Sequence, residues 1–119
     1  MVNHYVPHQG DIVLLNFEPQ AGKEQAGSRP ALVMSSVKYN EKVGLALCCP
    51  ITRIVKGYPF EVLLLNNLKT EGVILSDHIK NLDWKVRNAR YIEKVPRELI
   101  QEVSGKISLL LEIEENDRK

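Results

Sequence analysis

The sequence of 119 residues lacks the features that mark several broad classes of protein. No apolar run approaches the ~20 residues that a membrane-spanning helix needs, and the first residues, MVNHYVPHQGD, do not resemble a signal peptide. The formal net charge is only +1, which excludes a polybasic protein that holds nucleic acid by bulk charge. We therefore expect one globular domain over residues 1–119, located in the cytoplasm and not attached to a membrane.

Residues that commonly build metal, cofactor or covalent sites are also scarce. The only two cysteines, Cys48 and Cys49, are adjacent, so on a strand they would point to opposite faces and would not form a disulfide or a zinc-binding pair. The three histidines, His4, His8 and His78, are not in a ligand pattern, and no phosphate-binding loop of the nucleotide type is present. We expect neither a metal nor a cofactor.

Short apolar runs dominate the first three-quarters of the chain. Each run is the length of a strand, is bounded by glycine, proline or asparagine, and several are apolar on both faces. The runs are 11–17, 30–36, 44–51, 59–65, 72–76 and 89–95. After Pro96 the apolar spacing becomes helical, with a stripe at Leu99, Ile100, Val103, Ile107, Leu110 and Leu111. The pattern predicts a mainly β fold, a strongly bent sheet or small barrel of five to six short strands with a C-terminal helix.

Charge is unevenly distributed along this pattern. Residues 1–79 carry seven basic and seven acidic side chains, residues 80–97 carry six and two (net +4), and residues 98–119 carry three and six (net −3). The basic segment is either a solvated connection or a surface that attracts an anion or an acidic partner.

A long connection and two strand ends carry the residues with catalytic potential. Residues 18–29 form a twelve-residue connection that contains Glu24 and ends at Arg29. If runs 30–36 and 44–51 pair antiparallel, Arg29 and Thr52 lie at the same rim of the sheet. An arginine, a hydroxyl and a carboxylate at one rim suit phosphoryl chemistry, because guanidinium presents a planar fork of donors to phosphate. An ordinary surface ion pair is the alternative.

Several blocks in this order resemble the MazF/PemK family of bacterial toxins, and its MazF branch in particular. The blocks are GDIVLLNFEP, GKEQAGSRPALVMS, a strand ending in Pro-Ile-Thr, KGYPFEV and GVILSDHIKNLDWKVRNA. They extend from about residue 5 to about residue 113. EQAGSRPA and KGYPFEV are the most specific.

The resemblance implies a small SH3-like, CcdB-like barrel, a homodimer, and a metal-independent endoribonuclease that cleaves single-stranded RNA. It also implies a MazE-like antitoxin whose acidic, disordered tail occupies the RNA groove. Carried over by position, the catalytic residues are Arg29, Thr52 and Glu24. The alternative is a toxin like the related CcdB proteins, which share this barrel and bind gyrase without cutting RNA.

Side chains near these positions are candidates for RNA contacts. Aromatic rings can stack on bases, and basic or hydroxyl side chains can contact the backbone. We expect this role for Phe17, Ser28, Arg53, Lys56 and Tyr58. For Phe60 and Trp84 we favour core packing.

Overall fold

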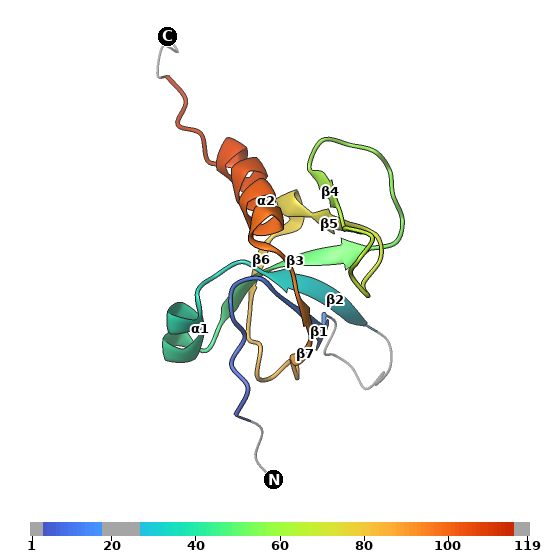
Figure 1. The fold of residues 1–119 in the computed structure, drawn as a ribbon. Coiled ribbons are helices and arrows are strands. Elements are labelled where there is room, and N and C mark those ends of the chain that lie inside the picture. The colour runs from blue at the N-terminus through green and yellow to red at the C-terminus, as the bar shows by residue number, and fades with distance from the viewer. Residues whose placement is uncertain (1–3, 18–26, 116–119) are drawn as a thin grey trace.

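The computed structural model describes residues 4–17 and 27–115, and it has a mainly β fold with a helix at the C-terminal end (Figure 1). The elements in chain order are β1 (Asp11–Asn16), β2 (Ser28–Val33), α1 (Val37–Val43), β3 (Ala46–Thr52), β4 (Glu61–Leu63), β5 (Val73–Leu75), the 3-10 helix η2 (Ser76–His78), β6 (Lys80–Leu82), β7 (Arg90–Lys94) and α2 (Arg97–Leu110). The predicted fold class is confirmed. The structure adds a seventh strand, β6, and a helix, α1, to the elements expected from the sequence.

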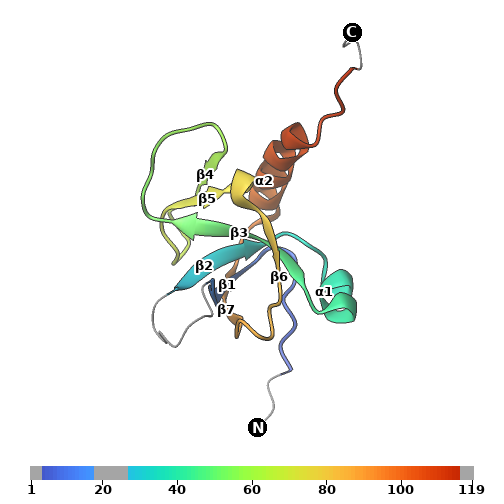
Figure 2. The ribbon, with the colours of Figure 1, turned by 180° about the vertical axis from the view of Figure 1, so that it is seen from behind.

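All strand pairs are antiparallel, in the order β4-β5-β3-β2-β1-β7, with β6 added beside β3. Strand β3 serves two sheet segments, because Ala46–Cys48 pair with β6 whereas Ile51 and Thr52 pair with β5. The sheet therefore bends strongly along β3, and β4, β5 and α2 lie at one end of it, as both views show (Figures 1 and 2).

Both faces of the central strands are buried, as the doubly apolar runs predict. Ile12 and Leu32 belong to one hydrophobic cluster, which α2 covers through Leu99 and Val103. The alternate residues Val13 and Leu15 belong to a second cluster with Leu82 and Trp84. Trp84 is thus a core residue, as expected, and its indole N–H donates to the carbonyl of Asn40 at 3.0 Å.

The adjacent cysteines point into different clusters, Cys48 with Val13 and Cys49 with Ile12. Both are free and buried, and burial raises the pKa of each thiol to about 12. They remain protonated thiols that pack as small apolar side chains.

Helix α1 lies between β2 and β3, in a stretch to which the sequence analysis assigned no element. Its N-cap is Ser36, whose hydroxyl accepts from the Tyr39 N–H, and it ends at Gly44, which has a left-handed conformation with φ of 83°. The buried side chain of Asn40 donates to the Pro7 carbonyl at 2.8 Å and so ties α1 to the N-terminal segment. The helix is stabilised by its caps and by this tertiary contact.

Helix α2 follows the predicted period but buries less of the stripe than expected. Pro96 is its N-cap, and Leu99 and Val103 are buried against the sheet. Leu110 and Leu111 were expected to continue the apolar stripe, but they are 46% and 74% exposed. The last residue of α2 that packs against the described core is Ile107, so Leu110 and Leu111 lie beyond that contact.

Candidate functional site

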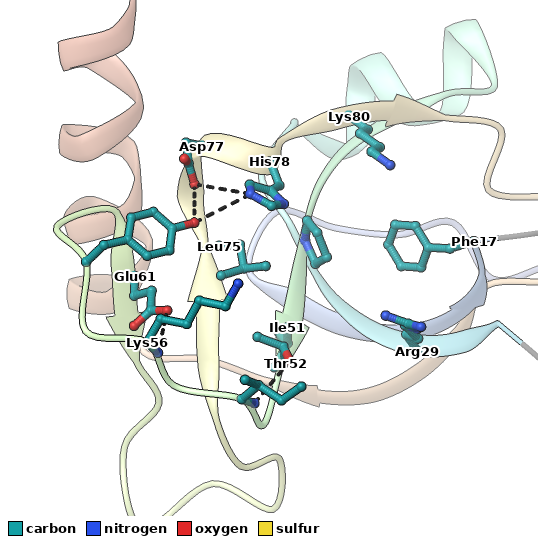
Figure 3. A pocket seen from close by; sticks show the side chains of 13 residues that line it. Phe17, Arg29, Ile51, Thr52, Lys56, Glu61, Leu75, Asp77, His78 and Lys80 are labelled. Carbon is teal, nitrogen blue, oxygen red and sulfur yellow. Dashed lines mark hydrogen bonds and ion pairs between the residues drawn. The ribbon is translucent and has the colours of Figure 1, made fainter.

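A cavity of about 730 Å³ opens where β2 begins and β3 ends, beside the connection that leads to β4 (Figure 3). Its walls come from β2, β3, β4, β5, η2 and β6, and from residues that flank them. The lining residues are Phe17, Arg29, Pro50, Ile51, Thr52, Ile54, Lys56, Tyr58, Glu61, Leu75, Asp77, His78 and Lys80.

Arg29 and Thr52 are brought to this cavity by strand register. Ala31 pairs with Pro50 in the antiparallel β2–β3 ladder. Two further steps outward along both strands place Arg29 across from Thr52. The arrangement expected from the sequence is therefore present.

The Thr52 hydroxyl has a defined orientation. Its oxygen accepts a hydrogen bond from the Ile54 N–H at 3.1 Å, which leaves the hydroxyl proton available as a donor. On the other side of Thr52 the backbone is closely approached by Gly72, whose φ is +118°. A Cβ atom at Gly72 would overlap the Thr52 carbonyl oxygen and lie 2.8 Å from the carbonyl carbon. The β4–β5 connection therefore packs directly against the backbone of Thr52.

The connection after β3 is shaped by a single carboxylate. Glu61 accepts from the Lys56 N–H at 3.0 Å and from the Gly57 N–H at 2.8 Å. The turn at Gly57 has φ of +84°. These two bonds fix the backbone from which Lys56 reaches the cavity (Figure 3), and Tyr58 of the same connection also lines it.

Asp77 and His78 lie at the opposite side of the cavity from Arg29 (Figure 3), and Tyr58 forms a polar cluster with them. The Tyr58 hydroxyl donates to Asp77 Oδ1 at 2.9 Å and lies 3.5 Å from His78 Nε2. His78 Nε2 is 3.9 Å from Asp77 Oδ1. Burial, followed by the hydrogen bond to Asp77, raises the pKa of the Tyr58 phenol, so the hydroxyl keeps its proton.

The end of β1 is held in place by a distant arginine. Arg87 Nη1 donates to the carbonyls of Asn16 at 2.9 Å and Phe17 at 3.0 Å, and the Asn16 N–H donates to the Arg87 carbonyl at 3.0 Å. Lys80 Nζ lies 5.9 Å from the centre of the Phe17 ring. Phe17 therefore presents an aromatic face beside a cation at the mouth of the cavity.

The sequence-predicted residues divide into three groups. Five of them line the cavity: Phe17, Arg29, Thr52, Lys56 and Tyr58. Ser28 and Arg53 are exposed next to Arg29 and Thr52 in the chain but are not among the lining residues. Glu24 lies outside the described residues.

Sequence reasoning missed four polar lining residues: Glu61, Asp77, His78 and Lys80. His78 was considered only as a metal ligand. A usable signal was present, because a polar Ser-Asp-His triplet follows directly after the apolar run that became β5. Polar residues at the end of a buried strand commonly face a site.

The electrostatics of the lining favour an anionic ligand modestly. Three cations face the cavity, Arg29, Lys56 and Lys80, against the two carboxylates of Glu61 and Asp77. Both carboxylates accept hydrogen bonds from the protein. Within residues 4–17 and 27–115, no group of three or more His, Cys, Asp or Glu side chains could hold a metal ion. The cavity thus offers fixed donors to phosphate oxygens and aromatic rings to bases.

No helix in the described part of the chain is long and apolar enough to cross a membrane.

Comparisons with known proteins agree with one another. The family model described as "PemK-like, MazF-like toxin of type II toxin-antitoxin system" matches residues 8–111. The Escherichia coli K12 protein named endoribonuclease toxin MazF is 44% identical over 93% of this chain and 99% of its own length. The E. coli endoribonuclease PemK is 32% identical over 87% of this chain and 80% of its own length.

Solved structures give the same result. The crystal structure of MazF from Deinococcus radiodurans is 50% identical, with a TM-score of 0.82 over 90% of this chain and 97% of that chain. A MazE–MazF crystal structure from the same organism is 48% identical, with a TM-score of 0.83 over the same shares of the two chains.

Proposed function

The chain belongs to the PemK-like, MazF-like toxin family of type II toxin–antitoxin systems and is an endoribonuclease of the MazF type, and on that premise we propose how it acts. Its substrate is single-stranded RNA, above all mRNA in the cytoplasm, and the cut is sequence-specific and independent of metal. The result is inhibited translation and arrested growth. The observation that carries this proposal is that Arg29 and Thr52 line the same cavity, which three cations face.

The proposed reaction uses the 2′-hydroxyl of the RNA as the nucleophile. Its oxygen bonds to the adjacent phosphorus while the bond from phosphorus to the 5′-oxygen breaks. The products are a 2′,3′-cyclic phosphate and a 5′-hydroxyl. The 2′-hydroxyl gives up one proton and the departing 5′-oxygen gains one, so water is not consumed in this step.

Arg29 donates to the phosphorane oxygens, where negative charge develops in the transition state. The Thr52 hydroxyl, which already accepts from the Ile54 N–H, donates its proton to a phosphate oxygen. Glu24 is the proposed base, or the residue that orients the base, and it lies outside the described residues.

RNA contacts follow from the same lining. The rings of Phe17 and Tyr58 stack on bases, and Lys56 contacts the phosphate backbone. Ser28 and Arg53, exposed beside the catalytic pair, extend the contact surface along the strand.

The direct test is incubation of the purified protein with a long synthetic single-stranded RNA in the presence of EDTA. We expect discrete fragments that end in a 2′,3′-cyclic phosphate and a 5′-hydroxyl. Activity that EDTA abolishes and added Mg²⁺ restores would contradict the metal-independent mechanism. Intact RNA together with inhibited DNA supercoiling would favour the CcdB-like alternative.

The proposed partner is an acidic, partly disordered antitoxin of the MazE kind. MazE–MazF complexes are among the similar solved structures. The cavity cations and the basic segment 80–97, from which Lys80 reaches the cavity, offer the complementary charge. An acidic antitoxin peptide should compete with RNA, and its affinity should fall as salt rises. Independent binding of both ligands at once would contradict a shared groove.

The protein is also proposed to be a homodimer. Leu109, Leu110, Leu111 and Ile113 leave an apolar surface exposed at the end of α2, and such a surface is typical of an interface. Sedimentation at micromolar concentration should give twice the 13.5 kDa mass of one chain. A mass of one chain at that concentration would refute the dimer.

A further inference from the structure

The cluster of Tyr58, Asp77 and His78 determines which nitrogen of His78 carries a proton. Tyr58 has a single hydroxyl proton, and the 2.9 Å bond to Asp77 Oδ1 uses it, because an ionised carboxylate only accepts hydrogen bonds. At the 3.5 Å contact with His78 Nε2, the Tyr58 oxygen therefore acts as the acceptor.

Both neighbours of His78 Nε2 thus favour a proton on that nitrogen. The Tyr58 oxygen offers a lone pair, and the Asp77 carboxylate offers negative charge at 3.9 Å. In a neutral imidazole only one ring nitrogen carries hydrogen. The lone pair of His78 is therefore on Nδ1.

His78 then adds a neutral ring nitrogen with a set direction to the acceptors of the described lining. Its side chain is 51% exposed and lines the cavity. Arg29, Lys56 and Lys80 are donors only. The carboxylates of Asp77 and Glu61 accept from Tyr58 and from two backbone N–H groups, and the acceptor sites that they retain belong to charged groups. Among the residues that the structure describes, His78 Nδ1 is an oriented side-chain acceptor for which no hydrogen bond to the protein is recorded.

We propose that His78 reads one base of the cleaved RNA and prefers an amino base, adenine or cytosine, over a keto base, guanine or uracil. Adenine N6 and cytosine N4 each present N–H donors, whereas guanine O6 and uracil O4, the substituents at the corresponding ring positions, are acceptors. Bases that are splayed out of single-stranded RNA and stacked on aromatic rings are read along these edges. Tyr58 holds the His78 ring for this contact. The inference rests on the proposed nuclease function and adds a specificity-determining residue to it.

The test compares cleavage of a set of single-stranded RNAs in which one nucleotide at a time is varied, in mildly alkaline buffer. At one position the wild-type protein should favour adenine and cytosine by about two- to tenfold in rate, the worth of one net hydrogen bond. His78→Phe keeps a flat ring without nitrogens and should abolish the preference at that position while it leaves other positions unchanged. His78→Arg replaces the acceptor by donors and should shift the preference toward guanine and uracil.

The matched control is His4→Phe, because His4 is an exposed histidine that is not among the residues lining this cavity. It should leave the preference intact. An unchanged preference in His78→Phe, or an equal loss of rate on every RNA, would overturn the inference while the nuclease function stands. A wild-type protein that cleaves none of the RNAs would overturn the proposed function and the inference with it.

A second measurement does not depend on cleavage. Long-range ¹H–¹⁵N NMR correlations distinguish a protonated ring nitrogen from one with a lone pair. We expect His78 in the wild-type protein to carry its proton on Nε2, and Tyr58→Phe, which lacks the accepting oxygen, to reduce that population. A wild-type His78 with its proton on Nδ1 would overturn the inference.

Discussion

Replacing Gly72 by alanine should displace the backbone of Thr52 and so impair the site, although Gly72 is not among the residues that line the cavity. Gly72 has φ of +118°, which is strained for any other residue, and its added Cβ would overlap the Thr52 carbonyl oxygen. The nearest atoms all belong to the backbone of Thr52 and Arg53, so no side chain can rotate away to relieve the overlap. The strand end that carries Thr52 has to move.

Gly44 provides a matched control for the backbone strain. Its φ is +83°, and an added Cβ would have no atom within 4 Å. Gly44→Ala should therefore cost only the left-handed conformation, about 1–2 kcal/mol of unfolding free energy. Gly72→Ala, at a φ farther from the left-handed helical region, should cost at least that strain and, in addition, about 1–3 kcal/mol for forced overpacking. The difference between the two variants reports the contact with Thr52 together with any extra strain at φ of +118°.

Urea unfolding followed by circular dichroism measures the stability of both variants. Cleavage of one RNA, under conditions in which both are folded, measures the effect on the site. A displacement of about 1 Å at a positioning group can cost on the order of a hundredfold in rate, and we expect a loss of that order for Gly72→Ala and none for Gly44→Ala. Equal unfolding midpoints for the two variants, together with a wild-type cleavage rate for Gly72→Ala, would refute the reasoning.

Three further predictions address other parts of the molecule. Arg29→Lys and Thr52→Val should each lower the cleavage rate by at least about a hundredfold with unchanged circular dichroism, since each removes a transition-state donor; rates within about threefold of wild type would remove both residues from the mechanism. Burial alone would raise the pKa of Glu93, but hydrogen bonds from the N–H groups of Lys69 and Thr70 and from the Thr70 hydroxyl lower it overall. The stability that Glu93 contributes is therefore fully present above the ordinary glutamate pKa and is lost as pH falls through the lowered pKa. The difference in urea midpoint between wild type and Glu93→Gln should shrink in acid. A difference that does not vary with pH would contradict this. Gly105→Ala should raise the stability of α2 by about 1 kcal/mol, because an added Cβ there has no atom within 4 Å; a lower melting temperature would show that the site is covered.

The fold class could be predicted because the apolar periods are local. The doubly apolar run at 11–17 indicated a strand covered on both faces, and the structure has Ile12 and Val13 in different clusters. Helix α1 was missed although Ser36 and Gly44 are typical helix boundaries. The run KNL could not be identified as β6, because its strand conformation comes from pairing with β3, a long-range contact.

The site could be predicted only in part, for a related reason. Counting residues along two neighbouring antiparallel strands was enough to predict that Arg29 and Thr52 lie at the same rim. The hydrogen bond from Tyr58 to Asp77 joins side chains 19 positions apart, and the hydrogen bond from Arg87 to the Phe17 carbonyl joins residues 70 positions apart. Such contacts depend on how the sheet bends, and no local period encodes that bend.

The hydrogen bonds from Arg87 to the end of β1 have a consequence for the stage of synthesis at which the protein can become active. Strand β1 forms near the start of the chain, but it is paired on one side by β7, and its end at Phe17 is held by Arg87. Contacts this distant in sequence form only after the loop-closure entropy between them has been overcome, and they tend to form slowly. A nascent chain that has not yet extended past Arg87 possesses every cavity residue from Phe17 to Lys80 but lacks β7, the strand that pairs with β1. A product of interrupted translation that ends before Arg87 is thus expected to be inactive. The toxin therefore acquires its active site only after nearly all of its mRNA has been translated.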